Sequence, residues 1–401
     1  MCVKELPEVF LNPYFARMKK ISIWTKIFWG LLILFVSVNV AIQITGNTYI
    51  YKALIYTYAD IDDLEVFDTR IVDNDKPQPW PVAADYNKSN LSAPLLSELT
   101  KNKSVAFLVI KDDSIRHEEY WDHYDKNSLS NSFSMAKSFI SILVGIAIDE
   151  GKIKSVDEPV GNYLPHFKEG KNAQLTIKNL LTMSSGLNWD ESYSSLFSAT
   201  TEAYYGTKLK RLVSKLDVVS LPGQKFDYMS CNTELLALIV QEATGKSVSE
   251  YASEKIWKPI GAEHPAQWSL DHTDGLEKAY CCFYSNARDF ARYGKLYLDS
   301  GQWNGRSIVS KEYVRESLTP AKMDFSGSEQ NCYGYQWWLT EEKGHHIFYA
   351  RGLRGQYIVV IPDQHIIFVR LGIERGKPAS DYKLSDLTVY IDEVLQQYGS
   401  R

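Results

Sequence analysis

The chain has 401 residues, 45% of them apolar and 23% charged, which is enough for two or three domains or for one large domain with additions. This composition excludes a wholly disordered chain, a collagen and a coiled coil as descriptions of the whole protein. A net charge of −5 leaves no basic footprint for DNA or RNA, so we expect no nucleic-acid partner. The five cysteines form no CxxC pair, which indicates neither a zinc site nor a disulfide framework, and the adjacent Cys281 and Cys282 are expected to be packing residues.

An uncharged apolar segment, residues 27–51, is long enough to cross about 30 Å of hydrocarbon. Basic residues precede it and acidic residues follow it, so the positive-inside rule places residues 1–26 in the cytoplasm and the rest of the chain outside. The sequence therefore predicts a single-pass anchor in the cell (inner) membrane. A cleaved signal peptide is the alternative, but the basic region is long and no small-x-small cleavage site stands out after the apolar core. A buried core helix would not need this length without a charge.

Residues 52–103 are rich in Asp, Asn and Pro and have neither a helical nor an alternating period, which predicts a stalk or an irregular lead-in. Residues 104–401 are expected to form one domain. It begins with two extended runs, Val105–Ile110 and Ile115–Trp121, whose short polar connection predicts a hairpin. Three further β runs lie near the C-terminal end: His346–Ala350, Gln356–Ile361 and Ile366–Gly372.

The middle of this domain has helical periodicity instead. Five segments carry it: Phe139–Ile148, Ile177–Met183, Leu235–Ala243, Tyr251–Trp257 and Ala287–Leu298. Gly151, Gly186 and Gly245 are placed as helix stops, and Leu384–Tyr398 is predicted as a closing amphipathic helix. We therefore predict an α+β fold, in which an antiparallel sheet from N- and C-terminal segments is flanked by helices, with a helical insertion and one preceding transmembrane helix.

The first candidate for chemistry is Ser134-Met135-Ala136-Lys137. A spacing of three on a helix puts both side chains on one face, so the lysine amine can act as a base for the serine hydroxyl. Chance alone predicts one or two such SxxK matches in a chain of this length, and a second one starts at Ser380. Ser134, however, opens a helix that is apolar on nearly every face, where a lysine is costly unless paired or neutral. Ser380 is better interpreted as the N-cap of a polar terminal helix.

Two further motifs are weak when taken alone. Tyr228 lies just before a predicted helix, with the hydroxyl of Ser230 two positions on, but a lone tyrosine is far more often structural than functional. The segment Ala350–Gln356 carries two glycines, Gly352 and Gly355, that permit close backbone approach, and an exposed N–H on such an edge can serve as an oxyanion donor. A bulged strand entry is an equally good interpretation of these glycines.

Together, and in this order, the three motifs resemble those of the serine β-lactamase and penicillin-binding superfamily, in the branch of class C enzymes and their esterase relatives. Other segments support the resemblance: Val160–Pro165, Ile177–Leu187, Asn286–Gly294 and Tyr333–Trp338. The resemblance covers residues from about 105 to the C-terminus. It implies a nucleophile at Ser134, a proton-transfer pair of Lys137 and Tyr228, and an oxyanion hole formed by the backbone N–H groups of Ser134 and Leu353. No metal or organic cofactor is implied.

The chain departs from the class C pattern at two places. Ser230 stands where those enzymes have an asparagine, and Ala350-Arg351-Gly352 stands where they have Lys-Thr-Gly. Both forms resemble those of the 6-aminohexanoate-dimer hydrolase group, which cleaves small amides and esters. The candidate substrate-binding residues are Ser230, Asn232, Arg351, Gly352 and Gly355, and whether Arg351 or Arg354 contacts the substrate stays open.

The sequence supports no other catalytic class. It has no GxSxG elbow, and Gly245-Lys246-Ser247 lacks the first glycine of a phosphate loop, so a helix stop is the better interpretation. The leading hypothesis is thus a membrane-anchored serine hydrolase that cleaves a small-molecule amide or ester through an acyl-enzyme on Ser134. The alternatives are a cell-wall D-Ala-D-Ala carboxypeptidase or β-lactamase, and a non-catalytic receptor or scaffold with this fold.

Overall fold

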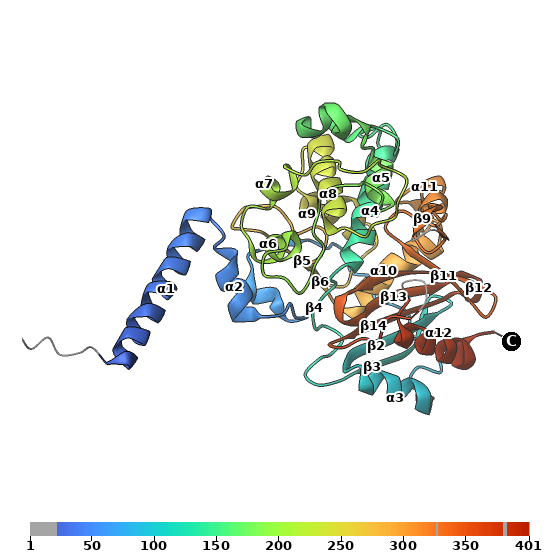
Figure 1. The fold of residues 1–401 in the computed structure, drawn as a ribbon. Helices are drawn as coiled ribbons and strands as arrows, with labels where there is room; N and C mark the ends of the chain where they lie inside the picture. Colours follow the sequence, from blue (N-terminus) through green and yellow to red (C-terminus); the bar gives the residue numbers. More distant parts are fainter. Residues whose placement is uncertain (1–21, 326–327, 380–382, 401) are drawn as a thin grey trace, which may run out of the picture.

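The computed structural model describes residues 22–325, 328–379 and 383–400, and Figure 1 shows their arrangement. The first helix, α1 (Ile23–Thr45), stands apart from the body of the molecule, and none of its residues is buried. Within the described ranges it is the one helix that is long and apolar enough to cross a membrane, judged by length and composition. Ile42, near the end of α1, packs against the core, but no residue of the helix is buried, so α1 is not a core helix of this domain.

A six-stranded antiparallel sheet forms the base of the body, with the strand order β11-β12-β13-β14-β2-β3 (Figure 1). Its strands are β2 (Ser104–Lys111), β3 (Ser114–Tyr120), β11 (Trp338–Glu342), β12 (His345–Gly352), β13 (Gln356–Ile361) and β14 (Ile366–Gly372). The N-terminal hairpin pairs with the last strand, so that Val109 lies opposite Phe368. The predicted hairpin, the three late strands and the sheet built from both ends of the domain are confirmed.

The two faces of this sheet bury different helices because successive side chains point to opposite faces. On one face Leu108 and Val369 join the core of α10 (Ala287–Leu298), whereas Phe107 and Phe368 face α3 (Ala93–Lys101) and α12 (Ser385–Tyr398). At Gly294 of α10, a side-chain carbon would come within 2.9 Å of Ile367. A glycine at this position thus lets the helix lie directly on the strands.

A layer of helices stands beside the sheet, as Figure 1 shows in green and yellow. It contains α4 (Met135–Asp149), α5 (Ile177–Leu181), α6 (Ala199–Tyr205), α7 (Leu209–Val213), α8 (Ser230–Thr244) and α9 (Val248–Ala252). The predicted helical segments are therefore confirmed, although α9 ends at Ala252 and continues as a π-helical turn, Ser253–Trp257. Gly245 adopts a φ of 69° directly after α8, which is the left-handed conformation expected of a helix stop.

A second, four-stranded sheet was not predicted because its strands are too short to show a period. Its order is β1-β5-β6-β4, with β1 (Thr69–Val72), β4 (Ser130–Asn131), β5 (Ala266–Ser269) and β6 (Phe283–Ser285). Small elements complete the body: β7 (Gln302–Trp303), β8 (Arg306–Ser307), α11 (Lys311–Ser317), β9 (Met323–Phe325) and β10 (Ser328–Gln330). The second sheet matters for function because β4 leads into Ser134.

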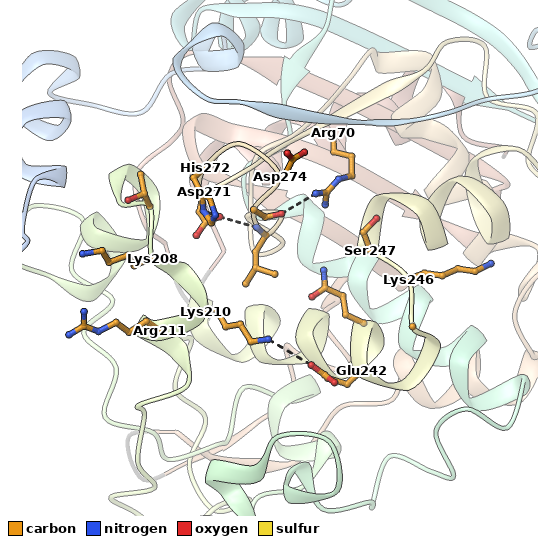
Figure 2. A pocket seen from close by; sticks show the side chains of 15 residues that line it. Arg70, Lys208, Lys210, Arg211, Glu242, Lys246, Ser247, Asp271, His272 and Asp274 are labelled. Atoms are coloured by element: carbon orange, nitrogen blue, oxygen red, sulfur yellow. Dashed lines mark hydrogen bonds and ion pairs between the residues drawn. The ribbon is translucent and has the colours of Figure 1, made fainter.

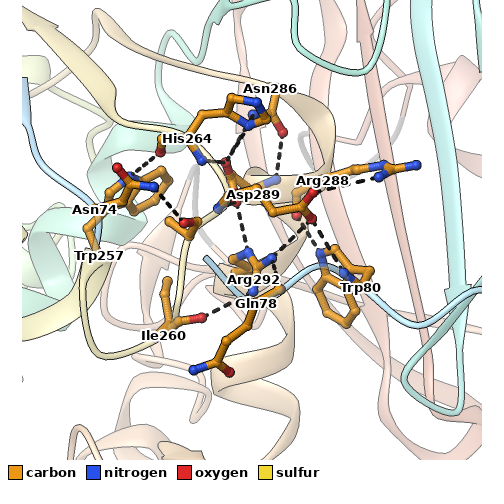
Figure 3. A network of polar contacts seen from close by, with 12 residues as sticks. Asn74, Gln78, Trp80, Trp257, Ile260, His264, Asn286, Arg288, Asp289 and Arg292 are labelled. Carbon is orange, nitrogen blue, oxygen red and sulfur yellow. Dashed lines mark hydrogen bonds and ion pairs between the residues drawn. The ribbon is translucent and has the colours of Figure 1, made fainter. Parts of the chain in front are cut away.

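Residues 52–103, expected to be a stalk or an irregular lead-in, lie against the domain. Helix α2 (Tyr49–Tyr56) packs on α6, and β1 pairs with β5. Figure 3 shows the polar network that holds the stretch of chain between β1 and α3. The Arg292 guanidinium donates to the carbonyl of Gln78 at 2.6 Å, and the Trp80 indole donates to the carbonyl of Arg288 at 2.8 Å. The buried carboxylate of Asp289 fixes Arg292 through a 2.8 Å bond to Nε.

Two expectations about single residues need a correction or a limit. Cys281 and Cys282 are buried, as packing residues would be, but they are also joined by a disulfide, which the sequence analysis did not predict. Disulfides usually connect residues that are further apart than chain neighbours, so an adjacent pair is a poor signal. Ser380 lies outside the described residues, and helix α12 begins at Ser385.

Candidate active site

Ser134 lies at the junction of β4 and α4. The residue before it, Phe133, has a φ of 43°, and its backbone N–H donates to the Asn131 side chain at 2.9 Å. A positive φ in a phenylalanine is unfavourable and needs such support from its surroundings. Ser134 is the N-cap residue of α4, yet its hydroxyl makes no capping bond, and the residue is partly exposed. Its Oγ is therefore open to other partners.

Lys137 lies one turn further along α4, and only 1% of its surface is exposed. Its Nζ is 3.1 Å from Ser134 Oγ and 3.3 Å from Ser230 Oγ, and it donates to the carbonyl of Tyr280 at 2.8 Å. The predicted pair of Ser134 and Lys137 is thus within hydrogen-bonding distance. The carbonyl of Tyr280 orients the amine without neutralising it.

Burial lowers the pKa of Lys137 to about 8, although the negative charge of Glu191 favours the protonated form and opposes this shift. An unperturbed lysine is almost wholly protonated at neutral pH. With a pKa of about 8, a useful fraction of Lys137 carries a free electron pair near pH 7 to 8, as a general base requires.

Tyr228 lies in the extended segment just before α8 and above Lys137. The Lys137 ammonium is 5.3 Å from the centroid of its ring, and the ring is stacked on Trp338 at 5.5 Å with an interplanar angle of 25°. Burial raises the pKa of Tyr228, whereas a hydrogen bond with Ser134 and the charge of Arg351 lower it. The structure therefore brings Ser134, Lys137 and Tyr228 together.

Glu191 is a member of this cluster that the sequence analysis missed. Its carboxylate accepts from the backbone N–H and from the hydroxyl of Ser230, both at 2.7 Å, and from the Trp189 indole at 2.6 Å. Ser230 thus connects Glu191 to the amine of Lys137. Glu191 stands in an irregular segment with no motif around it, so no spacing signal marks it in the sequence.

The Gly-x-x-Gly segment forms the turn between β12 and β13. At Gly352 a side-chain carbon would come within 2.3 Å of the carbonyl oxygen of Ser132, so glycine permits the close approach of this strand end to the segment that carries Ser134. Leu353 follows in the turn and is partly exposed. The two backbone segments named as oxyanion donors are therefore neighbours.

The two arginines of this segment have different surroundings. The Arg351 guanidinium lies 4.1 Å from the ring centroid of Trp338, on which Tyr228 also stacks. Arg354 donates to the carbonyl of Ala59 at 2.7 Å and lies 3.7 Å from the carboxylate of Asp60. Arg351 is thus close to the candidate site, whereas Arg354 holds the segment that follows α2.

Two of the candidate substrate-binding residues contact structural neighbours. Asn232 is fully buried in α8 and donates to the sulfur of Met183 at 3.3 Å, while its side-chain oxygen has no hydrogen-bond partner among the described residues. Gly355 has a φ of 78° and accepts a 2.8 Å hydrogen bond from Arg370 at its carbonyl. Both residues are therefore bonded to protein side chains and help to hold the surroundings of the site in place.

The family model for Beta-lactamase matches residues 94–384. The chain belongs to the β-lactamase family. Members of this family are serine hydrolases, amidases and esterases among them, and the resemblance to the serine β-lactamase and penicillin-binding superfamily is confirmed.

The chain is similar in sequence to one hydrolase and in fold to two solved structures. The 6-aminohexanoate-dimer hydrolase of Paenarthrobacter ureafaciens is 28% identical over 295 residues, which is 69% of this chain and 74% of that protein. A solved structure from Bacillus anthracis, assigned as a 6-aminohexanoate-dimer hydrolase, has a TM-score of 0.73 at 22% identity and covers 86% of this chain and 93% of its own. A family VIII carboxylesterase has a TM-score of 0.62 at 16% identity, covering 79% and 99%. The two solved structures show a shared fold.

Proposed function

We propose that this member of the β-lactamase family is a membrane-anchored serine hydrolase that cleaves small amides or esters outside the cytoplasm through an acyl-enzyme on Ser134. The observation that carries the proposal is the position of Lys137 Nζ, buried and 3.1 Å from the hydroxyl oxygen of a partly exposed serine. A receptor or scaffold has no physical need for an amine of lowered pKa beside a serine hydroxyl that caps no helix.

In the first step, Ser134 Oγ attacks the substrate carbonyl and its proton passes to the free amine of Lys137. The backbone N–H groups of Ser134 and Leu353 donate to the oxygen on which negative charge develops. The carbon–oxygen or carbon–nitrogen bond then breaks, and the leaving group takes a proton from the Tyr228 hydroxyl, which recovers one from Lys137. Water attacks the acyl-enzyme, so that the acyl group leaves as a carboxylic acid and Ser134 regains its proton.

The surroundings of Lys137 support this proton path. Ser230 accepts a hydrogen bond from Lys137 and donates one to Glu191, so the amine is held between two serine hydroxyls. The ring of Tyr228 lies over the same amine at 5.3 Å. A base with fixed partners loses little orientational freedom when it reaches the transition state.

The substrate preference follows from the departures in the second and third motifs. Ser230 replaces an amide and Ala350 replaces a lysine, which removes two groups that hold the amide and the carboxylate of a β-lactam in the class C relatives. Loss of one charge-assisted hydrogen bond is worth roughly 1.5 to 3 kcal/mol, or more than tenfold in binding. Of the two arginines in the third motif, Arg351 is the one proposed to interact with a substrate carboxylate, because its guanidinium lies 4.1 Å from the ring centroid of Trp338, on which Tyr228 stacks.

The anchor rests on α1. An apolar helix of 23 residues with no buried residue, whose one charge is Lys26 near its N-terminal end, is stable in lipid and costly in water. With basic residues before it and acidic residues after it, the positive-inside rule puts the domain outside the cytoplasm. Reporter fusions after residue 60, assayed in both compartments, test this placement. Reporter activity confined to the cytoplasm, or a mature chain that starts beyond Thr45, contradicts it.

A side-by-side assay tests the reaction and the substrate class. We expect kcat/KM for a p-nitrophenyl ester and a small linear amide to exceed that for nitrocefin and for a D-Ala-D-Ala peptide. All turnover is expected to disappear in Ser134→Ala and to persist in Ser380→Ala, which removes the other SxxK serine. Higher values for nitrocefin or for the peptide contradict the substrate class, and ester turnover that survives Ser134→Ala contradicts the mechanism.

A further inference from the structure

Exposed apolar side chains outside α1 gather in a few segments of the described chain. One segment is the end of α2 and the residues after it, where Ile55 and Tyr58 are each 73% exposed. Another is the loop before α6, where Phe197 is 76% exposed and Tyr193 and Leu196 are also exposed. Single exposed apolar residues are common, but gathered ones mark a surface that meets another apolar phase.

These two segments lie on neighbouring elements. Helix α2 packs on α6, and the ring of Tyr56 stacks on that of Tyr205 at 6.4 Å. The loop with Phe197 is fixed to the start of α6, because the hydroxyl of its N-cap residue, Ser198, donates to the carbonyl of Ser192 at 2.7 Å. The end of α2, the loop and α6 therefore lie next to one another, and we call residues 54–58 and 193–205 the α2–α6 face.

The α2–α6 face reaches the candidate active site. Tyr193 donates a hydrogen bond to Glu191, whose carboxylate accepts from the hydroxyl of Ser230 at 2.7 Å. Ser230 in turn is 3.3 Å from Lys137 Nζ. A path of three hydrogen bonds, through Glu191 and Ser230, thus connects the exposed aromatic side chain of Tyr193 to the lysine that the proposed mechanism uses.

The same face adjoins the outer end of the apolar helix. Only residues 46–48 separate α1 from α2, and three residues span at most about 10 Å. The Lys208 ammonium lies beside Gly46, where a side-chain carbon would be 3.4 Å from it. If α1 spans a bilayer, this short connection keeps the α2–α6 face close to the lipid headgroups.

Basic side chains on and next to α7, close to the α2–α6 face, can attract lipid phosphates. A surface cavity of about 760 Å³ lies next to α7, and Figure 2 shows that its wall carries acidic side chains, Glu242, Asp271 and Asp274, as well as basic ones. Lys208 and Arg211 extend on the side opposite Lys246, and Lys210 lies 3.9 Å from the carboxylate of Glu242. Lysine and arginine near an anionic bilayer each contribute about 1 kcal/mol of attraction.

We propose that the α2–α6 face rests on the outer leaflet of the membrane that α1 spans, and that Ser134 takes its substrate from that leaflet: an amphiphilic ester or amide with an apolar acyl chain. The inference rests on the proposed hydrolase function and names its substrate class. The acyl carbon forms a bond to Ser134 Oγ while its bond to the headgroup oxygen or nitrogen breaks, and that atom receives the proton. Water then releases the chain as a carboxylic acid.

The kinetic test uses the full chain in vesicles of equal parts phosphatidylcholine and phosphatidylglycerol. It compares kcat/KM for p-nitrophenyl dodecanoate, which partitions into lipid, with that for water-soluble p-nitrophenyl acetate. In a Leu196→Ser, Phe197→Ser double variant we expect the dodecanoate-to-acetate ratio to fall about tenfold or more, because burial of one large apolar side chain is worth at least that factor. Leu96→Ser, an exposed leucine on α3, is the matched control, and its ratio should stay within about twofold of the unmodified protein. An equal ratio in both variants overturns the inference.

A second measurement detects contact between the α2–α6 face and lipid, and it does not depend on catalysis. A photoreactive benzoylphenylalanine at position 197 or at position 96 is irradiated in the same vesicles, and lipid adducts are identified by mass. Adducts at 197 and none at 96 support the proposal, whereas absence of lipid adducts at 197 overturns it whatever the kinetics show. Acetate hydrolysis that survives Ser134→Ala contradicts the proposed function instead and leaves the crosslinking result standing.

Discussion

Lys137 and Lys278 are both buried in the domain, and burial lowers the pKa of the first to about 8 and of the second to about 7. Their neighbours differ. The Lys278 ammonium lies 3.9 Å from the ring centroid of Phe67 and donates to the carbonyl of Tyr204, whereas Lys137 reaches the hydroxyls of Ser134 and Ser230. The comparison teaches that a lowered pKa provides a free amine, but only a proton-bearing nucleophile beside it makes that amine a catalytic base.

The largest difference between the two lysines should appear on truncation. Lys137→Ala is expected to lower kcat/KM for an activated ester by about 10² to 10⁴-fold, the range typical of general acid–base groups. Lys278→Met should change it by less than about threefold. Steady-state kinetics of both variants, with thermal unfolding as a control for folding, check this. Similar losses in the two variants would make Lys137 a structural residue like Lys278.

The two lysines can also be compared through the aromatic ring next to each, Tyr228 beside Lys137 and Phe67 beside Lys278. Tyr228→Phe keeps the aromatic contact with Lys137 and Trp338 but removes the hydroxyl, so we expect acylation to slow by about 10²-fold with little change in unfolding temperature. Phe67→Leu, beside Lys278, should leave the rate nearly unchanged. Stopped-flow acylation with several esters and amides is the measurement, and near-normal rates for Tyr228→Phe would remove the proposed acid from the mechanism.

Substitution of Glu191 should have a smaller effect, a shift in the pH dependence of activity whose direction can be predicted. Its negative charge favours protonated Lys137, so Glu191→Gln should lower the pKa of Lys137 further below about 8. The free amine is the active form, so activity rises with pH through this pKa, and the rising limb should move to lower pH in the variant. A loss of about threefold in the maximal rate is expected from the weaker hold on Ser230. A limb that stays in place or moves to higher pH contradicts the assignment.

Lys278 should affect stability rather than rate. Its pKa is about 7 in the folded protein against 10.5 in the unfolded chain, so between these values the unfolded state binds more protons and folding becomes more favourable as pH rises. Lys278→Met removes this dependence. We expect the gain in unfolding free energy from pH 7 to pH 9 to be roughly 1 to 2 kcal/mol smaller in the variant, measured by urea denaturation. An unchanged pH dependence would mean that Lys278 is not neutral when folded.

Much of the fold could be predicted because local patterns and tertiary structure agree. The apolar runs of β2 and β14, which are buried on both faces of the sheet, and the apolar helix α4 are visible in the sequence and are present in the structure. Gly352 could also be placed, because a glycine at a strand end signals close backbone approach, and the carbonyl of Ser132 provides it.

Other features depend on contacts that no local pattern encodes. Glu191 meets Ser230 across 39 positions of sequence, and the pairing of β1 with β5 joins segments almost 200 positions apart. Arg354 looked as suitable as Arg351 for a substrate carboxylate until its bond to Ala59 placed it elsewhere. The tertiary fold determines which buried polar groups meet, so residue spacing in the sequence does not predict these partners.

The central claim is that Ser134 becomes acylated while Lys137 holds its proton. The direct test is intact-mass spectrometry of the protein quenched in acid during turnover of an activated ester, followed by peptide mapping of the adduct. We expect one acyl group on the peptide that contains Ser134, a slower appearance of that adduct in Lys137→Ala, a normal one in Lys278→Met, and none in Ser134→Ala. An adduct of the same mass in Ser134→Ala, or one that forms at the normal rate without Lys137, would contradict the account.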